Sequence, residues 1–287
     1  DFGPVGAAFH EELFVRQMKK MKEMGVNAIR FSHNPPAPEA LDICDKMGIL
    51  AIDEAFDEWQ IGKTLNGYSK HFDLWAKRDL EDMILRDRNH PSIIMWSIGN
   101  EIMEQYQQDP NKITSYLNNI VKNLDTTRAT TAGFNSANDA LKSGMAATVD
   151  VAGFNYKPGI YHKIREHYPN LKFYASETGG SLSTRNSYKF PVLFDTLQTK
   201  RGTSLNTQLY ADGQPGNHEN TNVPWGYAPY KEFASQEYND FVYGEFVWTG
   251  YDYLGEPSPY HTAKSRSSYF APVDMVGLEK DKFYLYK

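Results

Sequence analysis

The sequence predicts an α/β fold, a (β/α)8 barrel, and two observations lead to this prediction. Seven short apolar segments read as strands, and segments with helical periodicity separate most of them. Such alternation is typical of a parallel sheet, and 287 residues suit a barrel, whose usual length is about 250. An open, doubly wound sheet is the structural alternative, but the chain has no G-x-G-x-x-G turn to support it.

Each predicted strand is a short run rich in apolar residues. Several runs are apolar at consecutive positions, as expected for strands covered on both faces of a parallel sheet. The run IIMWSIGNE, for example, is mostly apolar until it ends in an amide and a carboxylate. In chain order the predicted strands are residues 26–33, 48–56, 92–101, 129–136, 150–156, 172–178 and 242–248.

The predicted helices carry apolar residues three or four positions apart. Gly25 ends the first helix, the second begins at Pro38 and is stopped by Gly48, and the third ends before Pro91. In chain order the predicted helices are residues 11–24, 38–47, 74–89, 113–124, 161–167 and 228–240. A barrel needs eight strands, so we expect the first strand to lie outside this chain, which we interpret as part of a longer protein.

The composition narrows the class of function. The net charge of −6 argues against nucleic-acid binding, and no apolar run approaches membrane-spanning length. The single cysteine, Cys44, excludes an internal disulfide and a cysteine-rich metal site, and it leaves the compartment open. Aromatic residues make up 14% of the chain, and although most must serve the core, aromatic faces can also stack on sugar rings.

Polar side chains recur at the ends of the predicted strands. In a barrel these ends meet at one rim, where such enzymes place their active sites. Six polar strand ends therefore predict an active site there. In chain order they contain Arg30, Ser32, His33 and Asn34; Asp53, Glu54 and Asp57; Asn100 and Glu101; Asn155 and Tyr156; Glu177; and Trp248, Tyr251 and Asp252.

Two of these residues, Glu101 and Glu177, end strands that should face each other across the mouth of the barrel. Paired carboxylates that flank a pocket are what glycoside hydrolysis requires. Two alternatives stay open at this point: buried carboxylates paired with arginine, and a divalent-metal cluster of Glu54, Asp57 and Glu58. The chain contains no D-x-D-x-D-G loop and no H-E-x-x-H helix that would favour a metal.

Five motifs of the chain resemble glycoside hydrolase family 2, and most closely its bacterial β-galactosidase-like members. The combination of RDRNHPS with S-x-G-N-E is highly specific, and the likeness is weakest over residues 186–227. The motifs are RFSHNPP (30–36), DEAFDEW (53–59), RDRNHPSIIMWSIGNE (86–101), ASETGGSLSTR (175–185) and GEFVWTGYDYLGEP (244–257).

The resemblance implies a (β/α)8 catalytic barrel over residues 1–287, flanked by β-sandwich domains in the full-length chain. It implies that Glu101 is the general acid/base, that Glu177 is the nucleophile, and that Asn100 holds the sugar 2-hydroxyl. The pKa of Glu101 should then be raised, because Glu101 must carry a proton beside the ionised Glu177. The remaining residues implied for substrate binding are Arg30, His33, Asn34, Asp57, Tyr156 and Trp248.

The activity implied by the resemblance is that of a retaining exo-β-glycosidase that removes terminal β-D-galactose from an oligosaccharide or polysaccharide. β-Glucuronidase, β-mannosidase and a carbohydrate-binding barrel without catalysis are the alternatives. No cofactor is expected. The stretch Glu58-Trp59-Gln60 lacks the metal-binding histidine of some β-galactosidases, so no metal is expected either. The oligomeric state is left open by the sequence, with a homo-oligomer as one alternative.

Three further segments have interpretations of their own. The polar stretch 179–228 is interpreted as an insertion that lines the site, with a passive surface loop as the alternative. IGKTLNG lacks the glycine pattern of a phosphate-binding loop and is interpreted as a surface turn. For Arg86, Arg88, Asn89 and His90 a structural role is favoured, as a turn that anchors the following strand.

Overall fold

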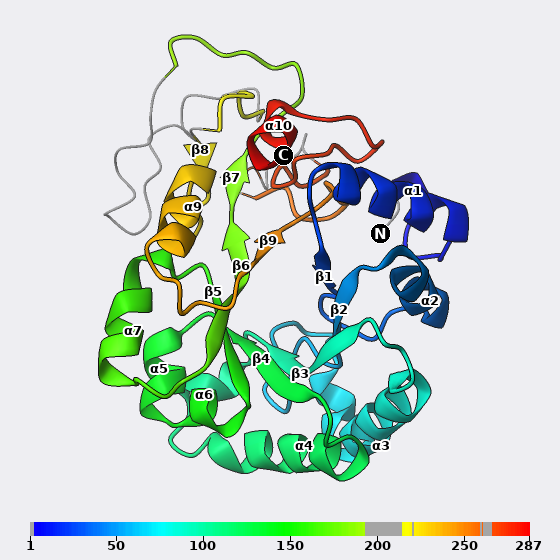
Figure 1. Cartoon of the computed structure of the whole chain (residues 1–287), viewed down its shortest axis with the longest axis vertical. Coiled ribbons are helices and arrows are strands. Elements are labelled where there is room, and N and C mark those ends of the chain that lie inside the picture. The colour runs from blue at the N-terminus through cyan, green and yellow to red at the C-terminus, as the bar shows by residue number, and fades with distance from the viewer. Residues whose placement is uncertain (1–2, 193–213, 220, 259, 261–265) are drawn as a thin grey trace. The chain divides into compact units, whose positions relative to one another are not determined.

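The computed structural model describes residues 3–192, 214–219, 221–258, 260 and 266–287 (Figure 1). The chain divides into two compact units. The sheet unit comprises Asn27–Glu177 and Asn239–Phe246, and the terminal unit comprises Asp1–Val26, Thr178–Tyr238 and Val247–Lys287.

In the part of the chain that the structure describes, seven strands form one sheet, as the sequence predicts. They are β1 (Ala28–Arg30), β2 (Leu50–Glu54), β3 (Ile93–Asn100), β4 (Ala129–Phe134), β5 (Val151–Asn155), β6 (Phe173–Gly179) and β9 (Glu245–Trp248). They are neighbours in this same order, and every pair from β1 to β6 is parallel. This is the strand order of a (β/α)8 barrel and excludes the doubly wound sheet, in which the order reverses. The last two residues of β6 and of β9 belong to the terminal unit.

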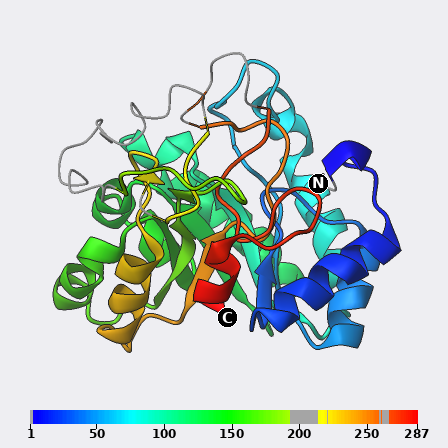
Figure 2. The ribbon, with the colours of Figure 1, turned by 90° about the horizontal axis from the view of Figure 1, so that it is seen from above.

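Helices connect the strands of the sheet unit and lie along its outer face, as Figure 1 and Figure 2 show. They are α2 (Pro38–Met47), α3 (Ser69–Asp87), α4 (Asn111–Leu124), α5 (Ala137–Lys142), α6 (Met145–Thr148) and α7 (Tyr161–His167). The short helices α5 and α6 were not predicted, because neither is long enough to show an apolar periodicity. In the described ranges, no helix is long and apolar enough to cross a membrane.

Helix α3 begins at Ser69, whereas the sequence predicts a start at Leu74. The reason is a contact from outside the helix: the Ser69 backbone N–H donates to the buried carboxylate of Glu58 at 2.8 Å. An anion at this end satisfies a free N–H group and interacts favourably with the helix dipole. No side chain at the start of α3 caps the helix, so its first residue cannot be predicted from the neighbouring sequence.

The two faces of the sheet bury different side chains. Residues Ala51 and Trp96 of the outer face pack in the main core, together with apolar residues of α3 and α4. On the opposite face, Ile52, Val151 and Tyr174 form a second apolar cluster, which Met95, Ala129 and Phe246 adjoin. Because side chains alternate along a strand, Glu54 follows Ile52 on this inner face, while Asp53 points toward the helices.

The terminal unit contains α1 (Glu11–Glu23), the antiparallel pair β7 (Ser181–Leu182) and β8 (Thr221–Asn222), α9 (Pro229–Glu237) and α10 (Asp281–Tyr286). Helix α1 and helix α9 match their predictions to within a few residues. The interpretation of 179–228 as a site-lining insertion rests largely on residues 193–213 and 220, which lie outside the described residues.

Candidate active site

Five strands of the sheet unit carry a connected group of polar side chains at or near their carboxyl ends. All five side chains are buried: Arg30 on β1, Glu54 on β2, Asn100 on β3, Asn155 on β5 and Glu177 on β6. Burying this many polar groups is costly unless each has a hydrogen-bond partner. The contacts between them supply these partners.

The guanidinium of Arg30 is the centre of the group. Its Nε and Nη2 donate to the Glu54 carboxylate at 2.7–3.0 Å, and its Nη1 donates to Glu177 Oε1 at 2.9 Å. Nη2 also donates to Asn100 Oδ1 at 2.9 Å. Burial alone would lower the pKa of Arg30, but the Glu54 and Glu177 carboxylates hold it above its usual value. Arg30 is therefore a permanent cation between two carboxylates.

Glu54 is fully engaged as a buried counter-ion. Besides Arg30, it accepts a hydrogen bond from Ser97 Oγ at 2.5 Å, and His33 Nδ1 lies 2.7 Å from its Oε1. Burial would raise the pKa of Glu54, but Arg30 and His33 hold it below the ordinary range. An ionised carboxylate with this many partners serves as a structural counter-ion of Arg30.

Glu177 is held by groups on two sides. Arg30 contacts its Oε1, the Tyr156 hydroxyl donates to its Oε2 at 2.9 Å, and His33 Nε2 lies 3.6 Å from Oε1. The backbone of Tyr156 is left-handed, with φ of +55°. A non-glycine residue is uncommon in that region and costs free energy there, so the surrounding fold must fix this orientation.

Glu101 also has a left-handed backbone, with φ of +44°, and its side chain contacts two amides. Asn155 Nδ2 donates to its Oε1 at 2.9 Å, and Asn135 Nδ2 donates to its Oε2 at 3.1 Å. Burial and the charge of Glu177 raise the pKa of Glu101, against a smaller opposing effect of Asn155, Lys63 and His33. The pKa of Glu101 is thus raised in the direction that the resemblance implies.

The side-chain amide of Asn100 lies between the partners of the two carboxyl groups: Arg30, which contacts Glu177, and Asn155, which contacts Glu101. Its Oδ1 accepts from Arg30 and from Asn155 Nδ2, the latter at 3.1 Å, and its Nδ2 lies 3.2 Å from His33 Nε2. Asn155 is oriented in turn by Ser176, whose Oγ donates to Asn155 Oδ1 at 2.6 Å. Hydrogen bonds to neighbouring side chains thus orient both amides.

Two glycines make room for this group. Gly133 pairs with Asn100 on one side and with Gly153 on the other in the strand register. A Cβ on Gly133 would lie 2.9 Å from Asn100 Oδ1 and 3.1 Å from Arg30 Nη2. A Cβ on Gly153 would lie 2.6 Å from Ser176 Oγ. Both positions therefore need glycine for steric reasons.

Three other predicted site residues, Asp57, Asn34 and Trp248, lie outside this buried group. Asp57 is 41% exposed, and its Oδ1 lies 2.7 Å from Lys63 Nζ and 3.4 Å from Asn100 Nδ2. Asn34 is exposed, and its role stays a prediction. Trp248 belongs to the terminal unit, where its indole donates to the Tyr253 hydroxyl at 3.1 Å, and its role also stays a prediction.

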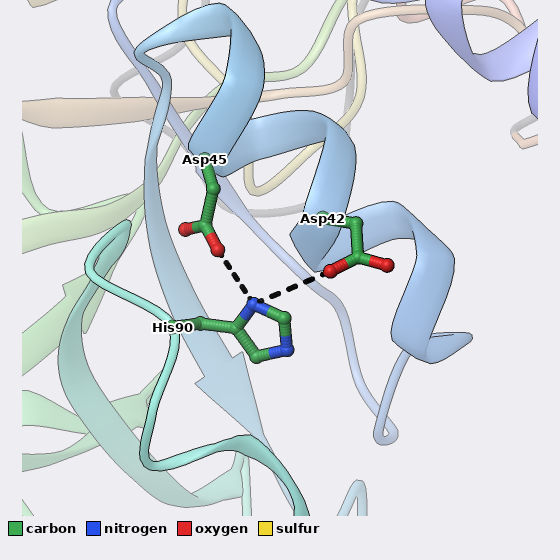
Figure 3. A group of neighbouring side chains, drawn as sticks. All are labelled: Asp42, Asp45 and His90. Atoms are coloured by element: carbon green, nitrogen blue, oxygen red, sulfur yellow. Dashed lines mark hydrogen bonds and ion pairs between the residues drawn. The ribbon is translucent and has the colours of Figure 1, made fainter.

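The divalent-metal cluster of Glu54, Asp57 and Glu58, which the sequence left open, is not found among the described residues. Glu54 is paired with Arg30, and Glu58 accepts the backbone N–H groups of Lys63 at 2.6 Å and Ser69 at 2.8 Å. Among the described residues, a group with metal-ligand spacing is Asp42, Asp45 and His90, where α2 meets the segment before β3 (Figure 3).

In that group His90 Nδ1 lies 2.7 Å from Asp45 Oδ2, and the Ser92 backbone N–H donates to Asp45 Oδ1 at 2.9 Å. Arg86 Nη2 also donates to the Pro36 carbonyl at 2.9 Å. These contacts fasten the turn before β3, as the structural interpretation of RDRNHPS expects.

Several residues of the site were not selected from the sequence. Asn155 and Glu54 were noted only as polar strand ends. Side chains alternate between the two faces of a strand, and this alternation could have assigned both residues to the inner face. Asn135 lies at the polar end of the predicted strand 129–136, a signal that could have found it, whereas Ser97 and Ser176 carried no separate signal. Lys63 was assigned to a surface turn, yet its ammonium contacts Asp57 and the Asn100 carbonyl.

Residues 3–265 match the family described as glycosyl hydrolases family 2, TIM barrel domain. The chain belongs to glycosyl hydrolase family 2. It is 39% identical to β-galactosidase BoGH2A of Bacteroides ovatus, with 100% of this chain and 37% of that protein covered. It is 31% identical to a putative β-glucuronidase of Formosa agariphila, with 99% of this chain and 28% of that protein covered.

Solved structures of family 2 are similar as well. A β-glycosidase from Bacteroides vulgatus is 30% identical with a TM-score of 0.82, and the match covers 99% of this chain and 37% of that one. The chain thus spans a little over a third of BoGH2A and of this β-glycosidase. The strand order described above agrees with the family's barrel.

Proposed function

We propose that the protein containing this family 2 barrel is a retaining exo-β-glycosidase that releases terminal β-D-galactose, with Glu101 as acid/base and Glu177 as nucleophile. The observation that carries the proposal is the contrast between the two carboxyl groups. Glu177 contacts the buried cation Arg30, whereas Glu101 contacts two neutral amides and has a raised pKa. Two carboxyl groups with such different surroundings are suited to different roles.

In the first step Glu177 attacks the anomeric carbon while Glu101 donates its proton to the departing glycosidic oxygen. The electron pair of the breaking bond goes to that oxygen, and a covalent glycosyl-enzyme forms at Glu177. The pairing of Glu177 with Arg30 and Tyr156 orients its carboxylate for the attack. Asn100 is oriented to hold the sugar 2-hydroxyl, where hydrogen bonds strengthen in the transition state.

In the second step water hydrolyses the intermediate. Esterification removes the negative charge of Glu177, which is one of the two causes of the raised pKa of Glu101. The pKa of Glu101 then falls, and its carboxylate takes a proton from the attacking water. The same side chain serves as acid and then as base because its neighbour changes charge between the two steps.

Galactose is proposed as the sugar because the 39% identical relative is named a β-galactosidase. β-Glucuronidase is the second candidate, since the 31% identical relative is named a putative β-glucuronidase. The resemblance to family 2 implies an E-[YF]-G context for the nucleophile of the β-glucuronidase branch, and Glu177-Thr178-Gly179 differs from it. Flanking β-sandwich domains in the full-length chain are part of the proposal.

The test uses the full-length protein and a panel of 4-nitrophenyl β-glycosides: galactoside, glucoside, glucuronide and mannoside. We expect kcat/KM for the galactoside to exceed the others by about 10²-fold, because a site that hydrogen-bonds one substrate hydroxyl rejects analogues in which it is misplaced. NMR should detect the β-anomer of the product first. A preference for the glucuronide would replace the proposed sugar, and initial release of the α-anomer would contradict the mechanism.

A further inference from the structure

The loop between β2 and α3 brings a lysine to the candidate active site. The side chain of Lys63 is only 21% exposed, although the sequence suggests a surface turn. Its Nζ donates to Asp57 Oδ1 at 2.7 Å and to the backbone carbonyl of Asn100 at 2.9 Å. That carbonyl belongs to the peptide unit that leads directly into Glu101.

Two buried carboxylates determine where this loop lies. Glu58 accepts the backbone N–H groups of Lys63 and Ser69, and Glu104 accepts the N–H of Ile61 at 2.8 Å. The loop also approaches Glu58 at Gly67, where a Cβ would lie 1.9 Å from Glu58 Oε1. The position of Lys63 is therefore fixed by contacts on both sides of it along the chain.

The charges around Glu101 give this lysine a distinct place. Arg30 is engaged by Glu54 and Glu177, whereas Lys63 is among the groups whose charge lowers the pKa of Glu101. Asp57 pairs with Lys63 and offsets part of its charge. Lys63 is thus a cation on the acid/base side of the site, as Arg30 is on the nucleophile side.

We propose that Lys63 is a positioning residue for hydrolysis, which holds the turn carrying Glu101 and stabilises the carboxylate that Glu101 becomes when it gives up its proton. The proposal rests on the proposed function of Glu101 as acid/base. The proton of Glu101 passes to the departing oxygen, and the negative charge left on Glu101 lies in the field of the Lys63 ammonium. The contribution should be largest for leaving groups that need a full proton.

The experiment compares full-length wild type, Lys63→Met, Lys63→Arg and the control Lys122→Met. Lys122 on α4 has the same kinds of partners, a carboxylate (Asp150) and a backbone carbonyl (Arg128), and is 31% exposed. For Lys63→Met we expect kcat/KM to fall about 10²-fold on the phenyl glycoside and about threefold or less on the dinitrophenyl glycoside, since general-acid assistance is worth about 10²–10⁴-fold. Lys63→Arg should restore most of the phenyl activity, and Lys122→Met should match wild type.

Both glycosides carry the sugar that the wild type hydrolyses best. An error in the proposed sugar therefore affects the proposed function and not the test of Lys63. A second measurement needs no turnover: the pKa of the Glu101 carboxyl, followed by ¹³C NMR and assigned with Glu101→Gln. It should rise by about half a unit or more in Lys63→Met and stay unchanged in Lys122→Met. Equal losses on both glycosides, or an unchanged Glu101 pKa, would overturn the assignment of Lys63. A wild type inactive on every glycoside would overturn the proposed function alone.

Discussion

Asp53 is expected to lower the stability of the folded protein at neutral pH. It is fully buried on the outer face of β2, and neither carboxylate oxygen has a hydrogen-bond donor among the described residues. Burial and the negative charge of the neighbouring Asp87 raise the pKa of Asp53 well above its ordinary value. Replacing Asp53 by Asn removes the titrating group and places an N–H₂ donor beside the Asp87 carboxylate.

The direction of the pH dependence follows from the raised pKa of Asp53 in the folded protein. The contribution of Asp53 to the free energy of unfolding is fully present below its unfolded pKa of about 3.9 and is lost as the pH rises through the folded pKa. Each unit between these two pKa values corresponds to about 1.4 kcal/mol, so Asp53→Asn can add at most about 4 kcal/mol at pH 7. We expect an increase of about 1–4 kcal/mol at neutral pH that shrinks toward pH 4.

Calorimetry of the full-length protein at several pH values measures this effect. The matched control is Asp125→Asn, because Asp125 is also buried but accepts hydrogen bonds from Trp96, Thr127 and Arg128. These donors outweigh burial and lower the pKa of Asp125, so its replacement should destabilise the protein at neutral pH and lose its effect in acid. A melting temperature of Asp53→Asn that is below wild type at neutral pH, or equally raised at all pH values, would refute the reasoning.

Three further predictions concern the carboxyl groups. The Glu101 and Glu177 carboxyls should lie about 5–5.5 Å apart in a crystal structure of the full-length protein, and about 8 Å would indicate inversion instead. With a dinitrophenyl glycoside, Glu101→Gln should still form a glycosyl-enzyme that mass spectrometry detects, whereas Glu177→Gln should form none; equal losses without an intermediate would contradict the two roles. A chelator should leave kcat/KM unchanged, because backbone N–H groups engage the Glu58 carboxylate; activity that is lost and then restored by Mg²⁺ would show otherwise.

Much of the fold could be predicted because its signals are local. An apolar run between turn residues predicts a strand, and Pro38 and Gly48 mark the ends of α2 because their backbone preferences act where they stand. The start of α3 could not be predicted in this way. It depends on Glu58, which is eleven residues before the N–H group that it caps.

The sequence by itself determined the seven strand segments, their polar ends and the positions of the carboxylates Glu101 and Glu177, because strand period and motif spacing are properties of the chain. Only the tertiary structure decided which polar groups meet. Glu54 faces Arg30 while its neighbour Asp53 faces Asp87, since consecutive side chains of a strand point to opposite faces. It also brought Lys63 and Asn135, from loops after β2 and β4, to the surroundings of Glu101. Such contacts depend on loop paths set by distant partners, which a sequence pattern does not encode.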